Sequence, residues 1–227
     1  MYGSTVLGET FQQLPFTGFS AAGYVLVAVA LLVTGLLLAR VRPLRAGADR
    51  TSAGPRRTAG IVAAVAVAVA GVLLLVFSGW WRGFETWSAA HAINVAGSRE
   101  TIGVPQNGIV VVTAHTGPPT LFALTSECTV AQILGAFLIG GAPLFLVRRL
   151  SALRVSTALL LASLVLVVVN LLRLTAIGVA IEDWGQHGFA LAHTYFGSLL
   201  TFVGTCLAGI AFAVVLIAHR APRELEP

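Results

Sequence analysis

The chain carries five apolar stretches that are each long enough to cross a lipid bilayer, and this feature constrains its fold more than any other. An α-helix needs about 20 apolar residues to span the bilayer core. The 227 residues are 57% hydrophobic and only 10% charged, whereas a soluble domain is about a quarter charged, so a soluble or disordered protein is excluded. We therefore predict an all-α integral membrane protein with five transmembrane helices, at 19–39, 59–79, 129–147, 156–180 and 192–218.

The distribution of arginine predicts the orientation of these spans. The 14 strongly basic residues are all arginine. Most of them lie in three regions between or after spans: Arg40, Arg42, Arg45, Arg50, Arg56, Arg57, Arg148, Arg149, Arg154, Arg220 and Arg223. Cytoplasmic loops are enriched in such residues, so we expect the N-terminus outside and the C-terminus in the cytoplasm. Because no basic residue precedes the first span, we do not expect it to be a cleaved signal peptide.

The segment 80–127 is the one long stretch expected outside the membrane, between the second and third spans. It begins with Trp80, Trp81 and Trp87, which suit the boundary between lipid and water, and we expect an interfacial helix over 80–96. Residues 109–113 are all β-branched and follow Asn107-Gly108, a pattern that predicts a short strand or hairpin. The segment is expected to form an extracellular cap over the helices.

Three chemically active side chains lie on different spans at one predicted depth. Cys128 stands at the outer end of the third span, His193 at the outer end of the fifth, and Arg173 about 10 Å below the outer end of the fourth. A thiolate is a strong nucleophile, and an imidazole can take the thiol proton and later protonate a leaving amine. A guanidinium can donate hydrogen bonds to the oxyanion of a tetrahedral intermediate. We predict that these three residues are catalytic.

Each of the three also has an ordinary interpretation when taken alone. A cysteine at a helix end is commonly a packing residue, a histidine there commonly lies at the interface, and an intramembrane arginine can extend to the interface. Their common depth favours a site. We add Glu127, Asn170 and Gly197 as substrate-binding or supporting residues, since Glu127 precedes Cys128 and Asn170 shares a helix face with Arg173.

These motifs resemble those of the exosortase/archaeosortase family, polytopic membrane transpeptidases that process C-terminal sorting signals. The family pattern is a Cys at the start of one span, Asn-x-x-Arg near the outer end of the next, and His-x-x-x-Gly opening another. The matching residues, within 60–220, are Cys128, Asn170 with Arg173, and His193 with Gly197. The resemblance implies that Cys128 is the nucleophile, His193 the acid/base, and Arg173 the oxyanion or substrate-positioning group. Many members have Ser-Gly after the Cys, where this chain has Thr129-Val130.

A second motif lies near the N-terminus. The residues Leu14, Pro15, Phe16, Thr17 and Gly18 form LPFTG, similar to the LPxTG signal of cell-wall sortases, and an apolar span and an arginine cluster follow it. Three interpretations stay open: a sorting signal offered to a separate sortase, a pseudosubstrate or substrate-recognition element, and a vestigial or accidental motif. The predicted organisation is LPFTG with the first span and arginine cluster (1–45), a cytoplasmic linker (46–58), the catalytic core (59–220) and a cytoplasmic tail (221–227).

The remaining polar residues carry weaker signals. Glu182, Asp183 and His187 lie near the predicted site, where they orient His193, pair with Arg173, or belong to an ordinary solvated loop. Cys206 lies 13 residues into the fifth span, and we expect it to be a packing residue. No histidine spacing indicates a metal site, and we expect no cofactor.

The predicted function is a membrane cysteine transpeptidase or peptidase that cleaves C-terminal sorting signals through a thioester. The alternative is a non-enzymatic transport or cell-surface assembly protein in which Arg173 binds an anion or a substrate. No Gly-x-Ser-x-Gly or His-Glu-x-x-His motif is present. The expected partners are membrane-anchored protein substrates, the bilayer and a sortase acting on LPFTG, with no nucleic acid. Alanine-rich, arginine-only usage and LPFTG indicate the plasma membrane of a Gram-positive, GC-rich bacterium, with the active site at the extracellular face.

Overall fold

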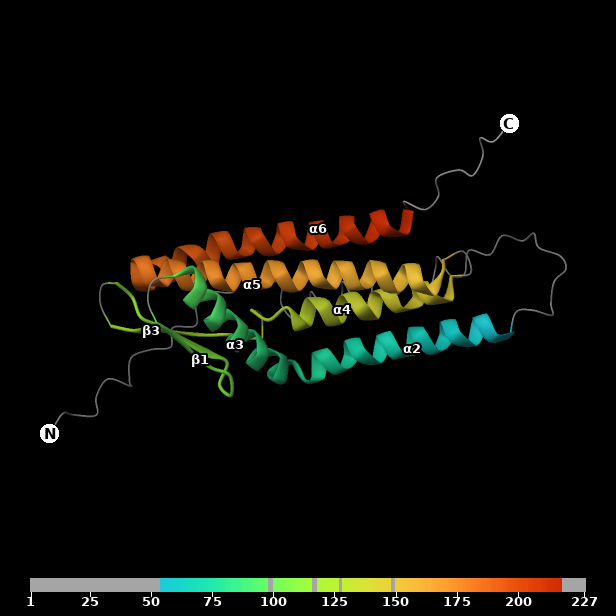
Figure 1. Cartoon of the computed structure of the whole chain (residues 1–227), viewed down its shortest axis with the longest axis horizontal. Coiled ribbons are helices and arrows are strands. Elements are labelled where there is room, and N and C mark those ends of the chain that lie inside the picture. The colour runs from blue at the N-terminus through green and yellow to red at the C-terminus, as the bar shows by residue number, and fades with distance from the viewer. Residues whose placement is uncertain (1–53, 98–99, 116–117, 127, 148–149, 218–227) are drawn as a thin grey trace, which may run out of the picture.

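Long helices make up most of the structure, and a small sheet lies near one end of them (Figure 1). The computed structural model describes residues 54–97, 100–115, 118–126, 128–147 and 150–217. The elements in chain order are α2 (Gly54–Val76), α3 (Ser78–Ala96), β1 (Thr101–Val104), β2 (Ile109–Val112), β3 (Thr120–Ala123), α4 (Ala131–Gly141), the 3-10 helix η1 (Ala142–Leu146), α5 (Ala152–Leu191), the π-helix η2 (Ala192–Phe196) and α6 (Gly197–Ile217). The predicted first span at 19–39 and the tail at 221–227 lie outside the described residues.

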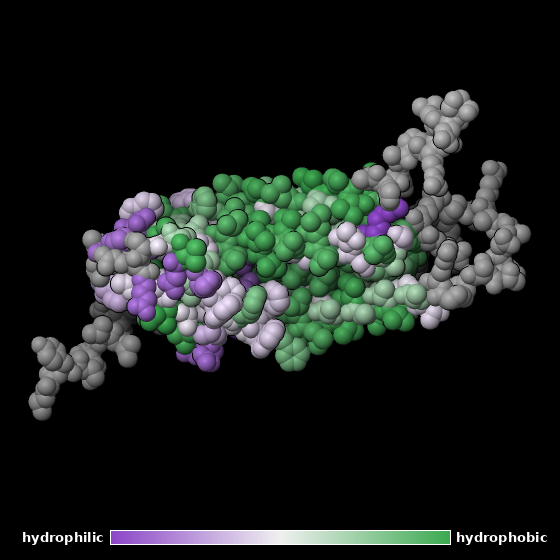
Figure 2. Space-filling view, viewed as in Figure 1, coloured by the Kyte–Doolittle hydropathy of each residue, from purple (hydrophilic) through white to green (hydrophobic). Residues whose placement is uncertain are grey.

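The described part contains two helices that are long and apolar enough to cross a membrane, Thr58–Val76 and Ala152–Ile217. Figure 2 shows an apolar surface along much of the helical body. Large apolar side chains are exposed on α2 and α6, among them Val65, Val69, Val72, Leu199, Phe202 and Ile210. Such a surface is compatible with a membrane protein, because lipid tails can cover it at no cost.

Gly185 reverses the direction of the chain near the end of α5. Its φ of 58° and ψ of −140° form a backbone conformation that residues with a side chain rarely adopt. The sequence predicted a loop between 180 and 192, but helix is present on both sides of this glycine, and α6 returns alongside α5 (Figure 1). The fourth predicted span therefore lies within α5, and the fifth corresponds to η2 and α6.

The third predicted span, 129–147, is represented by a shorter apolar helix. α4 begins at Ala131, and η1 continues it from Ala142 to Leu146 with Pro143 in its first turn. Proline lacks an N–H group and excludes the regular i to i−4 hydrogen bond, which favours a change to the tighter 3-10 geometry.

The cap segment contains a three-stranded antiparallel sheet in the order β1-β2-β3, so the prediction of an all-α chain was wrong for this part. The predicted strand at 109–113 is confirmed by β2, and the β1–β2 turn ends on Gly108 at a φ of 65°. Alternate residues of β2, Val110 and Val112, are fully buried in one cluster with Ile93 of α3 and Ile177 of α5. This burial holds the cap against α5, on the side where the predicted site lies.

Candidate functional site

Arg173 of α5 and Gly197 at the start of α6 meet because the chain reverses at Gly185. The Arg173 guanidinium passes directly over Gly197: a methyl group at position 197 would lie 3.0 Å from Arg173 Nε and 3.7 Å from Nη2. Gly197 is itself buried. The absence of a side chain at this position is therefore what lets the guanidinium approach the α6 backbone.

His193 lies beside Arg173, on the π-helical segment η2. Its ring stacks on Phe189, with centroids 5.2 Å apart and planes at 12°, and Phe189 in turn packs on Phe122 of β3. Arg173 lies within electrostatic range of this ring, and it contacts Gly197, about one turn after His193. A π-helical turn is rare, and such turns are frequent at functional sites. The structure thus brings together two of the three predicted catalytic side chains.

The Arg173 guanidinium has unused hydrogen-bonding capacity. Its Nε is buried, and among the described residues no acceptor bonds to it. A buried N–H group without an acceptor is unfavourable, and native structures usually supply a partner. An oxygen atom of a ligand would meet this need.

Cys128 lies in a turn just before α4 and is buried, with 8% of its surface exposed. Its N–H donates to the Thr125 carbonyl at 3.1 Å, and the Thr125 hydroxyl donates to its sulfur at 3.5 Å. In the part of the chain that the structure describes, the sulfur has no hydrogen bond with His193 or Arg173. The third predicted catalytic group is therefore not in direct contact with the other two.

Asn170 has a different partner from those predicted. We expected it to orient Arg173 or to bind substrate, but its Nδ2 donates to Glu85 Oε1 at 2.9 Å. The same Glu85 oxygen accepts the Val130 N–H at 2.9 Å. Glu85 therefore joins α3, the start of α4 and the face of α5 that carries Asn170.

Glu85 is not among the residues predicted for the site, and it is 93% buried. Burial raises the pKa of its carboxyl, while the nearby polar groups of Thr129, Val130, Trp81 and Asn170 act in the opposite direction. Its position four residues before Ala89 and eight before Ile93 places it on the buried face of α3, and this spacing is the signal that could have identified it.

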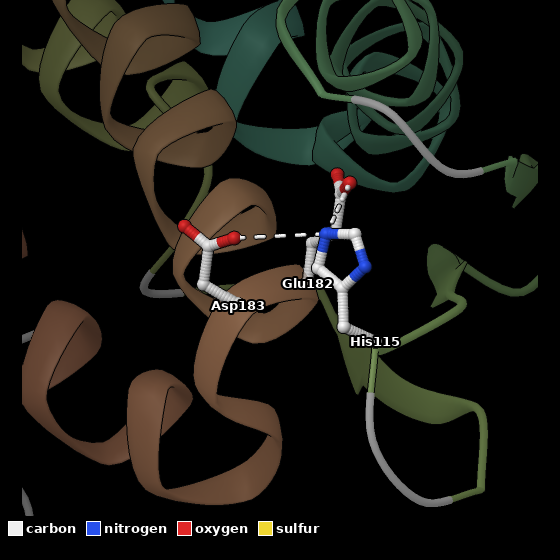
Figure 3. Close-up of polar contacts among 3 residues, drawn as sticks. All are labelled: His115, Glu182 and Asp183. Carbon is white, nitrogen blue, oxygen red and sulfur yellow. Dashed lines mark ion pairs between the residues drawn. The ribbon is translucent and has the colours of Figure 1, made fainter.

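Glu182 and Asp183 pair with His115 of the cap (Figure 3), rather than with His193 or Arg173 as predicted. His115 Nε2 lies 3.4 Å from Glu182 Oε1 and 3.8 Å from Asp183 Oδ1. The backbone N–H of His115 also donates to the backbone carbonyl of Glu182 at 2.9 Å. Glu182 is only 2% exposed, so the interpretation as a solvated loop is also wrong for it. The cluster fixes the cap onto α5 next to the reversal at Gly185.

The remaining predictions concern Glu127, the LPFTG motif, Cys206 and a metal site. Glu127 and the LPFTG residues 14–18 lie outside the described residues. Cys206 is exposed on α6, so its expected packing role was wrong. Within the described ranges, no group of three or more metal-binding side chains is present.

The assignment of a function depends on this geometry and on the chemistry of its residues. Comparison of the chain with protein-family models, with curated proteins and with solved structures found no match.

Proposed function

We propose that the protein is a membrane-embedded cysteine transpeptidase or peptidase, similar to exosortases, that cleaves C-terminal sorting signals of secreted surface proteins. The observation that carries the proposal is the Arg173 guanidinium beside the His193 ring, with a buried Nε that lacks an acceptor. An oxyanion site needs a donor of this kind, fixed in place and shielded from water. Cys128 supplies the nucleophile.

The proposed reaction has two halves. His193 takes the proton of the Cys128 thiol, and the sulfur attacks the substrate carbonyl to form a tetrahedral intermediate whose oxyanion binds Arg173. The intermediate collapses as the peptide C–N bond breaks, and His193 returns the proton to the leaving amine. An acceptor amine or water then attacks the thioester, which releases the product and restores the thiol.

The sulfur must approach the imidazole when substrate binds. Catalytic contacts are commonly long in an enzyme without substrate and tighten in the complex. Thr125 holds the Cys128 sulfur in a turn rather than within a helix, so a change in this turn moves the sulfur without disrupting α4. The Thr125 hydroxyl remains available as a donor after the thiol loses its proton.

The proposal places four of the five spans in the described chain, with the cap outside. α4 and η1 together extend for roughly 27 Å, close to the thickness of a bilayer core. The starts of α2 and α5 and the end of α6 lie at the end of the body away from the cap (Figure 1). Arginines lie near these ends in the sequence, among them Arg154, Arg220 and Arg223, which supports a cytoplasmic location for that end and an outer location for the site.

The proposal also includes the class of substrate and the cellular location of the protein. Its substrates are membrane-anchored proteins that reach the site from within the bilayer, and its location is the plasma membrane of a Gram-positive, GC-rich bacterium. We further propose that LPFTG is offered on the outer face to a separate sortase. An intact N-terminus through Gly18, found by mass spectrometry of protein from a sortase-bearing host, would exclude that processing.

The test compares the C-termini of membrane-anchored surface proteins, by mass spectrometry, in cells that express the wild-type protein or a variant. Cys128→Ala and His193→Ala are expected to leave the sorting signals uncleaved while the protein still inserts. Cys206→Ala is the matched control, since it removes the other, exposed thiol and is expected to process normally. Full processing by Cys128→Ala would defeat the proposal.

The same variants separate this function from the non-enzymatic alternative. Anion flux into proteoliposomes that requires Arg173 and survives Cys128→Ala would favour transport, because a transporter has no need of the thiol.

A further inference from the structure

Glu85 is a buried carboxyl group at the junction of three elements. It lies on the face of α3 that packs into the protein, together with Thr86, Ala89 and Ile93. A carboxylate that is removed from water is unfavourable unless hydrogen bonds compensate it. Its contacts therefore show which parts of the structure depend on it.

One oxygen of Glu85 makes both of its hydrogen bonds. Oε1 accepts the Val130 N–H and the Asn170 amide, each at 2.9 Å. Oε2 is buried, and within the described residues it accepts no hydrogen bond. The carboxylate also faces the N-terminus of α4, where the helix dipole favours negative charge. Glu85 thus connects the start of α4 to α5 through a single acceptor atom.

The two partners of Glu85 stand next to residues of the proposed site. Val130 follows Cys128 by two residues, and Asn170 precedes Arg173 by three residues on the same face of α5. Two residue steps of at most about 3.6 Å each keep the Cys128 Cα within about 7 Å of the Val130 Cα. The position of Glu85 therefore sets where the Cys128 turn lies relative to α5.

We propose that Glu85 is the positioning residue that holds the Cys128 turn against the Asn170–Arg173 face of α5, by accepting hydrogen bonds from Val130 and Asn170. Its meaning for catalysis rests on the proposed function above. The positioning itself is a property of the folded chain. Glu85→Gln retains a carbonyl acceptor at this place, whereas Glu85→Ala removes it.

The rate at which Cys128 is alkylated measures the positioning directly. We would use full-length protein in lipid nanodiscs, in a Cys206→Ala background so that one thiol remains, with iodoacetamide as the probe. Loss of a buried hydrogen bond to a charged group raises the equilibrium constant for local opening by roughly tenfold or more. Glu85→Ala is therefore expected to speed Cys128 alkylation by about tenfold or more. Glu85→Gln is expected to stay within about threefold of the parent.

Thr86→Val provides the matched control on the same helix. Thr86 is buried, as Glu85 is, but among the described residues its hydroxyl donates to the Arg82 carbonyl one turn earlier in α3 and to no other element. This variant is expected to alkylate at the parent rate. Should Glu85→Ala fail to fold, Asn170→Ala removes one of the two donors and is expected to speed alkylation by a smaller factor, about threefold.

The outcomes distinguish failure of the positioning from failure of the proposed function. Unchanged alkylation in folded Glu85→Ala, an equal increase in Thr86→Val, or an increase in Glu85→Gln as large as in Glu85→Ala would each overturn the positioning role. Alkylation needs no peptidase activity, so the result holds even if the chain processes no substrate. For a processing enzyme, Glu85→Ala is expected to lower kcat by about tenfold with little change in KM, and Glu85→Gln to restore it.

Discussion

Because Arg173 contacts Gly197, we expect a methyl group added at position 197 to lower activity while leaving the stability of the protein almost unchanged. In Gly197→Ala the new carbon would lie 3.0 Å from Arg173 Nε and 3.2 Å from the Ala192 carbonyl oxygen. This is about half an ångström inside an ordinary non-bonded contact. The flexible arginine side chain moves more easily than the helix, so the guanidinium is displaced by about that distance. Since a 1 Å error in position can cost about 10²-fold in rate, we expect a loss of about tenfold.

The expected effect on stability is small, because two contributions oppose each other. Alanine in place of a helical glycine gains up to about 1 kcal/mol, and the close contact with Arg173 costs a similar amount. Gly209→Ala, in the same helix, is the matched control: its methyl group would meet no atom within 4 Å, so it is expected to stabilise slightly and to process normally. Gly204→Ala would place its methyl group against the β-branched Val169 side chain of α5 and is expected to destabilise by about 1–3 kcal/mol.

The assay is processing of surface proteins in cells, read beside the thermal unfolding of each purified variant in detergent. We expect three different outcomes on one helix: a loss of activity at position 197, a loss of stability at 204 and neither at 209. Wild-type processing by a folded Gly197→Ala variant would refute the role of the Arg173 position. A loss of activity in Gly209→Ala would show instead that α6 tolerates no substitution.

Three further predictions follow from the geometry. Gly185→Ala is expected to lower the free energy of unfolding in detergent by at least about 1–2 kcal/mol, because the backbone conformation at this position is strained for alanine. The added methyl group would meet no atom within 4 Å, so the strain alone is tested, and an unchanged unfolding temperature would contradict the prediction. The raised pKa of Glu85 means that the folded protein binds this proton more tightly than the unfolded chain. The stability of the wild type should therefore fall relative to Glu85→Gln as pH rises through the window above the ordinary carboxyl value, and parallel unfolding profiles would refute this. Deletion of Tyr195, which is 73% exposed, should convert η2 to α-helix and rotate His193 away from Arg173, so that the protein folds but does not process its substrates.

Patterns that depend on near neighbours in the sequence predicted much of the helical body. Long apolar runs predicted α2, α5 and α6, because burial in lipid or in a helix pair requires continuous apolar surface. The β-branched run after Asn107-Gly108 predicted β2. The reversal at Gly185 was not predictable in this way. A glycine in a short stretch with several polar residues is typical of a loop, and its exact backbone conformation depends on how α6 packs against α5.

Contacts between distant residues account for the site features that the sequence did not predict. Glu85 is buried by packing against Asn170, which lies 85 residues later, and in sequence it stands among tryptophans that indicate a membrane interface. Glu182 pairs with His115 across a cap whose position depends on the burial of β2. The importance of the spacing between His193 and Gly197 was predicted from the family resemblance alone. The folded structure supplies a physical reason for that spacing.

α5 supports both the segment that carries His193 and the turn that carries Cys128. Gly197 follows His193 by four residues, which places them one turn apart on the same side of the helix, and the Arg173 guanidinium occupies the space left by the missing side chain. Asn170, three residues before Arg173, is bonded through Glu85 to the turn that carries the thiol. The imidazole segment and the thiol segment are thus each fixed to α5, at points about 4.5 Å apart along its axis. One helical turn of α5 therefore anchors both segments, and a substitution that breaks either contact changes how far the Cys128 sulfur must move to reach the His193 ring, without altering either residue.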